Sequence, residues 1–280
     1  MHFQLPSKGA VRRLGHVPST LLIPLAARAH GAKLFPDWDP HDRCAAAQLQ
    51  RCGVQVQDLR QDPCTVLNVL WRTRLIQQWG RQFFERHPRS TGVNLGAGLA
   101  QHFQWLDNGR NRWIDADLPE VLALRQGCQE GLPARVRQQA LDLRLPGWWS
   151  ALPLGRHRQA PWLVLLEGVL MYFHPQQVRA VLAELAEHAP PGTEVLCDFI
   201  SPWGVGCAGL NPSMAATHAQ FRSGARHAQD LADMHPRLRV LGQCSVAQAY
   251  GQVGTWLEMC CAPWAGGPMY AMAHLQVGAA

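Results

Sequence analysis

The stretch TGVNLGAG, from Thr91 to Gly98, decides the fold of this chain. Its first five residues form a short apolar segment typical of a buried strand, and they run directly into Gly96-Ala97-Gly98. A strand that ends in such a turn is typical of an open α/β sheet, because glycine lets the backbone approach a ligand closely. A single Gly-x-Gly turn is also common as a plain tight turn, so its meaning depends on the segments around it.

Those segments alternate between strands and helices. Further strands are expected at 112–116, 134–140, 162–166 and 193–200. Between them, residues 119–129 indicate a helix, and Pro175 opens an amphipathic helix with one apolar stripe: Val178, Val181, Leu182, Leu185 and Ala189. This alternation predicts an α/β fold, a doubly wound and mostly parallel sheet with helices on both faces.

The two ends of the chain differ from this core. Residues 1–60 indicate short helical pieces broken by prolines, and a longer helix is expected from Thr65 to Arg86. The Gly- and Pro-rich region 203–280 is expected to supply one helix and two late strands. We find no linker, so 1–280 is interpreted as one domain, with a helical N-terminal cap (1–87), a cofactor-binding core (88–200) and a part that completes the sheet (201–280).

Composition excludes several classes of function. Of the 280 residues, 47% are hydrophobic and 16% charged, as in a globular protein. The net charge of +6 comes from scattered basic residues, so no nucleic-acid partner is expected. Nine cysteines without a CxxC pair favour a reduced, cytoplasmic chain, and thirteen histidines without metal-ligand spacing favour no metal. No apolar run reaches the ~18 residues of a membrane span, so no membrane partner is expected.

An apolar stretch near the N-terminus allows two interpretations. The stretch from Ser19 to Ala27 faintly resembles a secretory signal with a small-residue cleavage site. Pro24 interrupts it, however, and Arg28 ends it after only a few residues. We favour a short apolar helix that packs over an active site.

The residues that follow the first four strands suit a nucleoside ligand. They are Gly96 with Gly98, Asp117, Asp142 and Glu167. In open α/β sheets, ligands bind beyond the carboxyl ends of the strands. A carboxylate after the second strand can accept hydrogen bonds from ribose hydroxyls, and one after the third can accept from the adenine amine. Each acid alone could be a helix cap or a loop residue, but a buried acid such as Glu167 is costly without a partner.

A nicotinamide or flavin dinucleotide enzyme is the main rival interpretation. Its fingerprint is GxGxxG or GxGxxA, in which the third small residue allows close packing of helix and strand. This chain has Gln101 at that position. The sequence therefore disfavours a nucleotide-dependent oxidoreductase.

Several segments in one order resemble the leucine carboxyl methyltransferase family, especially its bacterial branch of tetracenomycin-type polyketide O-methyltransferases. The resemblance extends roughly from Gly15 to Pro202. It is carried by HVPSTLLIPLAARA (16–29), LWRTRLIQQWGRQFFERHP (70–88), GVNLGAGL (92–99), WIDADLPEVLALR (113–125), ALDLR (140–144), LLEGVLMYF (165–173) and CDFISP (197–202). It implies a class I, Rossmann-like methyltransferase that uses S-adenosyl-L-methionine and methylates a carboxylate or hydroxyl of a small, polyketide-like acceptor.

The resemblance also implies roles for seven residues toward the cofactor. Arg72 would bind the methionine carboxylate, Gly96 and Gly98 would line the cofactor turn, Asp117 would hold the ribose, Asp142 with Leu143 would meet the adenine, and Glu167 would lie near the methionine amino group or the sulfonium.

One departure from the family pattern leaves an alternative open. The family usually continues its glycine turn as Gly-Leu-Asp-Thr-Arg, whereas this chain has Leu99-Ala100-Gln101-His102 after Gly98. The missing acid and base allow a non-catalytic protein that binds S-adenosylmethionine without turning it over.

The sequence does not identify a general base. A carboxylate acceptor is already ionised at neutral pH, whereas a phenol or alcohol would benefit from a base. Tyr172, His174 and His102 are the candidates. We prefer the plain interpretation of each, which is packing for Tyr172, helix capping for His174 and a surface loop for His102. The identity of the acceptor, the choice of ester or ether product and the oligomeric state stay open.

Overall fold

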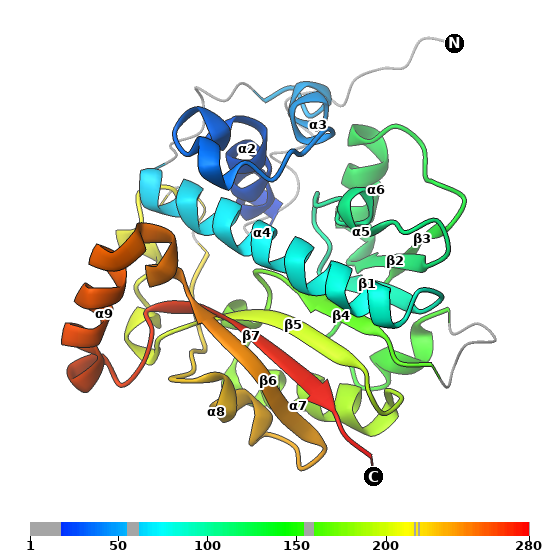
Figure 1. The fold of residues 1–280 in the computed structure, drawn as a ribbon. Coiled ribbons are helices and arrows are strands. Elements are labelled where there is room, and N and C mark those ends of the chain that lie inside the picture. The colour runs from blue at the N-terminus through cyan, green and yellow to red at the C-terminus, as the bar shows by residue number, and fades with distance from the viewer. Residues whose placement is uncertain (1–17, 55–61, 154–159, 216, 218, 280) are drawn as a thin grey trace.

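The architecture is a seven-stranded sheet with helices on both faces (Figure 1). The computed structural model describes residues 18–54, 62–153, 160–215, 217 and 219–279. The strands in the sheet order β3-β2-β1-β4-β5-β7-β6 are β3 (Val136–Ala140), β2 (Arg112–Asp117), β1 (Thr91–Leu95), β4 (Leu163–Leu166), β5 (Glu194–Ile200), β7 (Tyr270–Val277) and β6 (Leu238–Ser245). β1 to β5 pair in parallel, and β7 runs antiparallel to both β5 and β6. The predicted α/β, mostly parallel fold is confirmed.

Helices cover the sheet on two sides. The α-helices of the described residues are α2 (Leu22–His30), α3 (Ala45–Arg51), α4 (Pro63–Arg86), α5 (Phe103–Leu106), α6 (Pro119–Cys128), α7 (Pro175–His188), α8 (Ala228–Ala232) and α9 (Gly251–Ala265). In Figure 1, α4 crosses one face of the sheet, and α7 and α8 lie on the other. The helix α4 begins at Pro63 because the Asp62 side chain accepts a hydrogen bond from the Thr65 N–H and caps it.

The continuous apolar character of β4 follows from its central place. Successive side chains of a strand point to opposite faces. Val164 and Leu166 pack in the same core cluster as the stripe of α7, whereas Leu163 and Leu165 belong to the cluster that contains Trp71 of α4. All four strand residues are fully buried. A strand covered on both faces lacks polar alternation, and this explains its sequence.

Two expectations about the ends of the chain have different outcomes. The apolar stretch near the N-terminus forms η1 (Pro18–Leu21) and α2, and α2 packs against α3 and α4. Pro24 lies in the first turn of α2, where backbone N–H groups have no partner within the helix. The expectation of a single helix in region 203–280 was wrong, because both α8 and α9 form there. Apart from Glu258, α9 has no charged residue and shows no amphipathic stripe, so no periodic pattern marks it.

Among the described residues, no helix has the length and apolar character needed to cross a bilayer.

Candidate functional site

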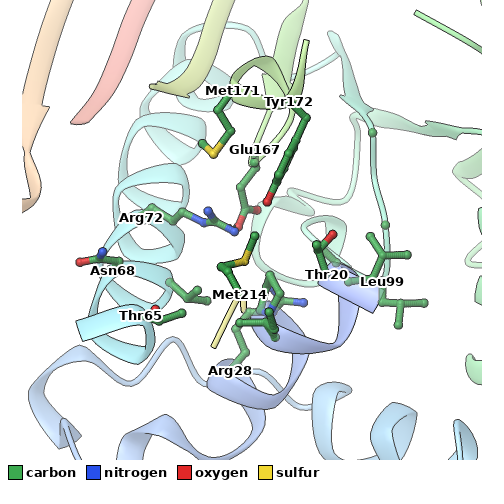
Figure 2. A pocket seen from close by; sticks show the side chains of 18 of the residues that line it. Thr20, Arg28, Thr65, Asn68, Arg72, Leu99, Glu167, Met171, Tyr172 and Met214 are labelled. Carbon is green, nitrogen blue, oxygen red and sulfur yellow. The ribbon is translucent and has the colours of Figure 1, made fainter. Parts of the chain in front are cut away.

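A cavity of about 230 Å³ lies beyond the carboxyl ends of β1 and β4 (Figure 2). This is the switch point of the sheet, where the chain crosses from one half to the other and where open α/β sheets bind ligands. Its walls come from η1, α2, the first half of α4, the turn after β1, the residues after β4, and the loop that contains Asn211, Met214 and Phe221. The apolar helix α2 therefore does lie over this site.

Both glycines of the turn after β1 are required by its backbone. Gly96 and Gly98 have φ angles of +70° and +50°, a region that favours glycine. A Cβ on Gly96 would lie 2.5 Å from Val169 Cγ2, and one on Gly98 would lie 2.8 Å from Leu21 Cδ2. The turn therefore presents bare backbone to the cavity that both residues line.

Two side chains, those of Asp117 and Arg125, hold this turn in place. The Gly98 N–H donates to Asp117 Oδ2 (2.7 Å), and the Leu118 N–H donates to Asp117 Oδ1 (2.7 Å). Arg125 Nη1 donates to the Gly98 carbonyl (2.9 Å), and its Nη2 donates to Asp115 Oδ2 (2.7 Å). Burial raises the pKa of Asp117, although the two N–H donors offset part of that rise.

A network centred on Arg72 forms the inner wall of the cavity. Arg72 Nε donates to Glu167 Oε1 (2.7 Å), and its Nη1 donates to Asp198 Oδ2 (3.1 Å) and to the Tyr270 hydroxyl (2.9 Å). Tyr270 in turn donates to Asp198 Oδ2 (2.5 Å). Figure 2 shows Arg72 extending from α4 toward Glu167, with Tyr172 beside them. The second Glu167 oxygen, Oε2, lies 2.6 Å from His102 Nε2.

The network controls the ionisation of its two carboxylates. Burial alone would raise the pKa of Glu167, but the charges of Arg72 and His102 outweigh burial and hold this pKa well below its ordinary value. Glu167 is therefore ionised at neutral pH. At Asp198 burial dominates and raises the pKa, although Arg72 and the Tyr270 hydroxyl oppose that rise.

The structure brings some of the predicted cofactor residues together at the cavity. Arg72, Gly96, Gly98 and Glu167 line it. The remaining three lie outside its lining. Asp117 is hydrogen-bonded behind Gly98, Asp142 follows β3 and is paired with Arg144 (2.6 Å), and Leu143 is buried in the core on the α7 side of the sheet. The role of each of the seven toward a cofactor stays a prediction.

The three candidate bases lie in different surroundings. Tyr172 lines the cavity, and burial raises its pKa to about 12. His174 caps α7, where its backbone N–H donates to Gln177 Oε1 (2.9 Å). The expectation that His102 lies on a surface loop was wrong, because its side chain is fully buried against Glu167 and Trp105. His102 directly precedes the short α5, which begins at Phe103.

Sequence reasoning missed several polar residues of the site. Arg28 is buried on α2, its Nε donates to Asp42 Oδ2 (2.9 Å), and its Nη1 has no partner among the described residues although Arg28 lines the cavity. Asn94 of β1 also lines the cavity, and neither of its buried amide atoms is hydrogen-bonded within the described chain. A cation that directly follows an apolar run, as Arg28 does, was the available signal. Asp198 and Tyr270 are brought together by the pairing of β5 with β7, and no pattern within either segment records that contact.

Comparison with known proteins adds two kinds of finding. The family model for leucine carboxyl methyltransferase matches residues 20–186. The tetracenomycin polyketide synthesis O-methyltransferase of Streptomyces glaucescens is 28% identical over 241 residues, which cover 85% of this chain and 86% of that protein.

Solved structures show the same fold at low identity. A protein of the DUF574 family from Streptomyces avermitilis matches with a TM-score of 0.54 at 13% identity, over 77% of this chain and 86% of its own. A candidate methyltransferase from Thermobifida fusca matches with a TM-score of 0.53 at 15% identity, over 76% of this chain and 83% of its own. At these identities the likeness shows the fold alone.

Proposed function

This chain belongs to the leucine carboxyl methyltransferase family, and from that premise we propose that it is an S-adenosylmethionine-dependent O-methyltransferase acting on a carboxylate of a small molecule. The observation that carries the proposal is the cavity at the switch point, where bare glycine backbone, Arg72 and Glu167 come together. The Streptomyces glaucescens relative, named for O-methylation in polyketide synthesis, supports oxygen as the acceptor atom and a polyketide-like acceptor.

The residues of the cavity, and Asp117 behind its glycine turn, fit this cofactor. Arg28 offers a buried N–H donor without a partner among the described residues, which suits the carboxylate of a methionine tail. Arg72 also lines the cavity, and the ionised Glu167 beside it suits an ammonium or a sulfonium. Each carboxylate oxygen of Asp117 accepts one hydrogen bond from a backbone N–H, so further lone pairs are left for ribose hydroxyls.

Each side chain then has a limited task in the transfer. Bound S-adenosylmethionine supplies an electrophilic methyl group. Arg28 and Arg72 would bind its carboxylate, Glu167 would fix the charged end, and Asp142 with Leu143 would meet the adenine. α2 and Met214 contribute to the walls of the cavity and would help to keep water from the acceptor, whose oxygen must be aligned with the methyl group.

The ionisation states at the acceptor end favour a carboxylate over a hydroxyl. The cavity lining includes apolar and aromatic side chains, among them Met171, Tyr172, Met214 and Phe221. Tyr172 stays protonated at neutral pH because burial raises its pKa to about 12, and Glu167 is held in ion pairs. Neither of these two lining residues can therefore remove a proton from an alcohol. A carboxylate acceptor, with an ordinary pKa of about 4, needs no such base.

A transfer assay with an alkaline step tests the proposal. The protein is incubated with S-adenosylmethionine labelled on its methyl group and a panel of aromatic carboxylic acids and their phenol counterparts. We expect label that mild alkali releases as volatile methanol, which identifies a methyl ester. Alkali-stable label would show methylation of a hydroxyl and contradict the carboxylate. Binding of the cofactor without transfer to any acceptor would favour the non-catalytic alternative raised by Ala100.

We predict that Asp117→Ala weakens S-adenosylhomocysteine binding by about 1.5–3 kcal/mol, the scale of a lost hydrogen bond to a charged group. The loss has two parts, because Asp117 would contact the ribose and also holds the Gly98 N–H. Calorimetric titration measures it, with thermal unfolding as a check of the fold and the exposed Asp233→Ala as a matched control. Unchanged affinity in a folded Asp117→Ala protein would remove Asp117 from the site.

We predict that Tyr172→Phe keeps the methyl-transfer rate within about tenfold, whereas loss of a general base costs about 10²–10⁴-fold. With its pKa raised to about 12, the Tyr172 hydroxyl is protonated at every lower pH, so at pH 8 only about one molecule in 10⁴ carries the phenolate. The rate is measured at several pH values for the variant and for Tyr250→Phe, a change at a partly exposed tyrosine outside the cavity lining. A loss above 100-fold for Tyr172→Phe alone would assign it catalytic proton transfer.

A further inference from the structure

His102 is a buried polar residue that the proposed mechanism does not use. It lies four residues after Gly98, at the start of α5, and its side chain is fully shielded from solvent. Its ring contacts Trp105 with the centroids 5.6 Å apart. On its other side, Nε2 lies 2.6 Å from Glu167 Oε2. His102 therefore links the turn after β1 to the carboxylate that follows β4.

Glu167 is held at both of its oxygens as a result. Arg72 Nε donates to Oε1, and His102 faces Oε2. Because Glu167 is ionised, its oxygens can only accept hydrogen bonds. The His102 Nε2 atom must therefore carry the proton of the 2.6 Å contact with Oε2. Two donors from two different elements fix the plane of a carboxylate, whereas one donor leaves it free to turn about its last bond. Each oxygen keeps a further lone pair for a ligand in the cavity that Glu167 lines.

The second ring nitrogen shows that His102 is a costly choice for packing alone. Nδ1 is buried and has no hydrogen-bond partner among the described residues. A buried polar atom without a partner costs stability. An apolar ring would fill this space against Trp105 without that cost. Such a ring would, however, lack the Nε2–H that contacts Glu167.

We propose that His102 is a positioning residue, whose Nε2–H holds the Glu167 carboxylate in the orientation that receives the charged methionine end of the cofactor. The inference rests on the proposed function, since it assigns a cofactor contact to Glu167. His102 itself is absent from the cavity lining and acts only through Glu167.

Two replacements of His102 separate its hydrogen bond from its volume. His102→Gln keeps an N–H donor at similar reach, and His102→Phe keeps a ring against Trp105 but has no donor. We expect S-adenosylhomocysteine to bind His102→Gln within about threefold of the parent protein and to bind His102→Phe about tenfold or more weakly, the scale of a charge-assisted hydrogen bond. Isothermal titration measures both, and the thermal midpoints of the unliganded variants check the fold.

A double-mutant cycle with Glu167→Gln tests whether the effect passes through Glu167. In the Glu167→Gln background, His102→Phe is expected to change the affinity by less than about twofold, because the carboxylate it positions is gone. Equal losses in both backgrounds, or parent-like affinity of His102→Phe, would overturn the inference. If His102→Phe lacks a cooperative unfolding transition, His102→Met, which also has no donor, takes its place. Absence of binding to the parent protein would overturn the proposed function itself, and the inference with it.

Discussion

Replacing Arg72 by methionine is expected to lower the free energy of unfolding by about 3–5 kcal/mol and to abolish measurable S-adenosylhomocysteine binding. The side chain is nearly conserved in volume, so the loss is electrostatic. Arg72 is the cation shared by Glu167 and Asp198, and Asp198 is completely buried. Without Arg72, the two carboxylates lose their shared cation in surroundings of low dielectric constant, where an unpaired charge is far more costly than in water.

The pH dependence of this loss follows from the two carboxylates. In the parent protein Arg72 helps to hold the pKa of Glu167 below its ordinary value, so this group stabilises the fold at neutral pH and loses that effect as pH falls. Without Arg72 the folded-state pKa of both acids rises, and protonation then favours the folded form. The deficit of Arg72→Met should therefore be smaller near about pH 5 than near about pH 8.

Urea unfolding at both pH values and calorimetric titration measure these effects. Arg74→Met is the matched control, since Arg74 lies on the same helix with an exposed side chain. A deficit below about 1 kcal/mol for Arg72→Met, the scale of a surface pair, would show that the network is not a buried one. A deficit that grows toward low pH would contradict the assigned charges.

Arg125→Met is the second change with a large expected effect. It is expected to cost about 3–5 kcal/mol of stability, because the Asp115 carboxylate would keep only the Trp113 Nε1–H as a partner among the described residues. It also removes the donor to the Gly98 carbonyl, so S-adenosylhomocysteine should bind about tenfold more weakly. Urea unfolding and calorimetric titration measure the two losses separately.

A double variant shows whether these losses have separate causes. Adding Asp115→Asn to Arg125→Met removes the unpaired charge while Trp113 can still donate to the amide oxygen. Stability should recover in part, since replacing both partners of a buried pair costs less than removing one. The affinity should not recover, because Gly98 still lacks its donor. Full recovery of affinity would show that Arg125 supports the fold and not the turn.

Short sequence patterns were enough to predict the positions of the strand, the glycine turn and the acid that form part of the site. The strand and glycine turn at 91–98 and the acid after β4 depend on burial and backbone geometry, and both appear where they were expected. The antiparallel pairing of β5 with β7 brings Tyr270 to Arg72 across 198 positions, and no local pattern records such a contact. For the same reason, His102 could not be recognised as a buried partner of Glu167, which lies 65 positions away.

A crystal structure with saturating S-adenosylhomocysteine tests the central claim most directly. We predict one molecule at the carboxyl ends of β1 and β4, with its backbone approach at Gly98, its ribose against Asp117 and its amino acid end between Arg28 and Glu167. A complex in which the ligand lies elsewhere, or a crystal that takes up none of it at saturation, would contradict the account.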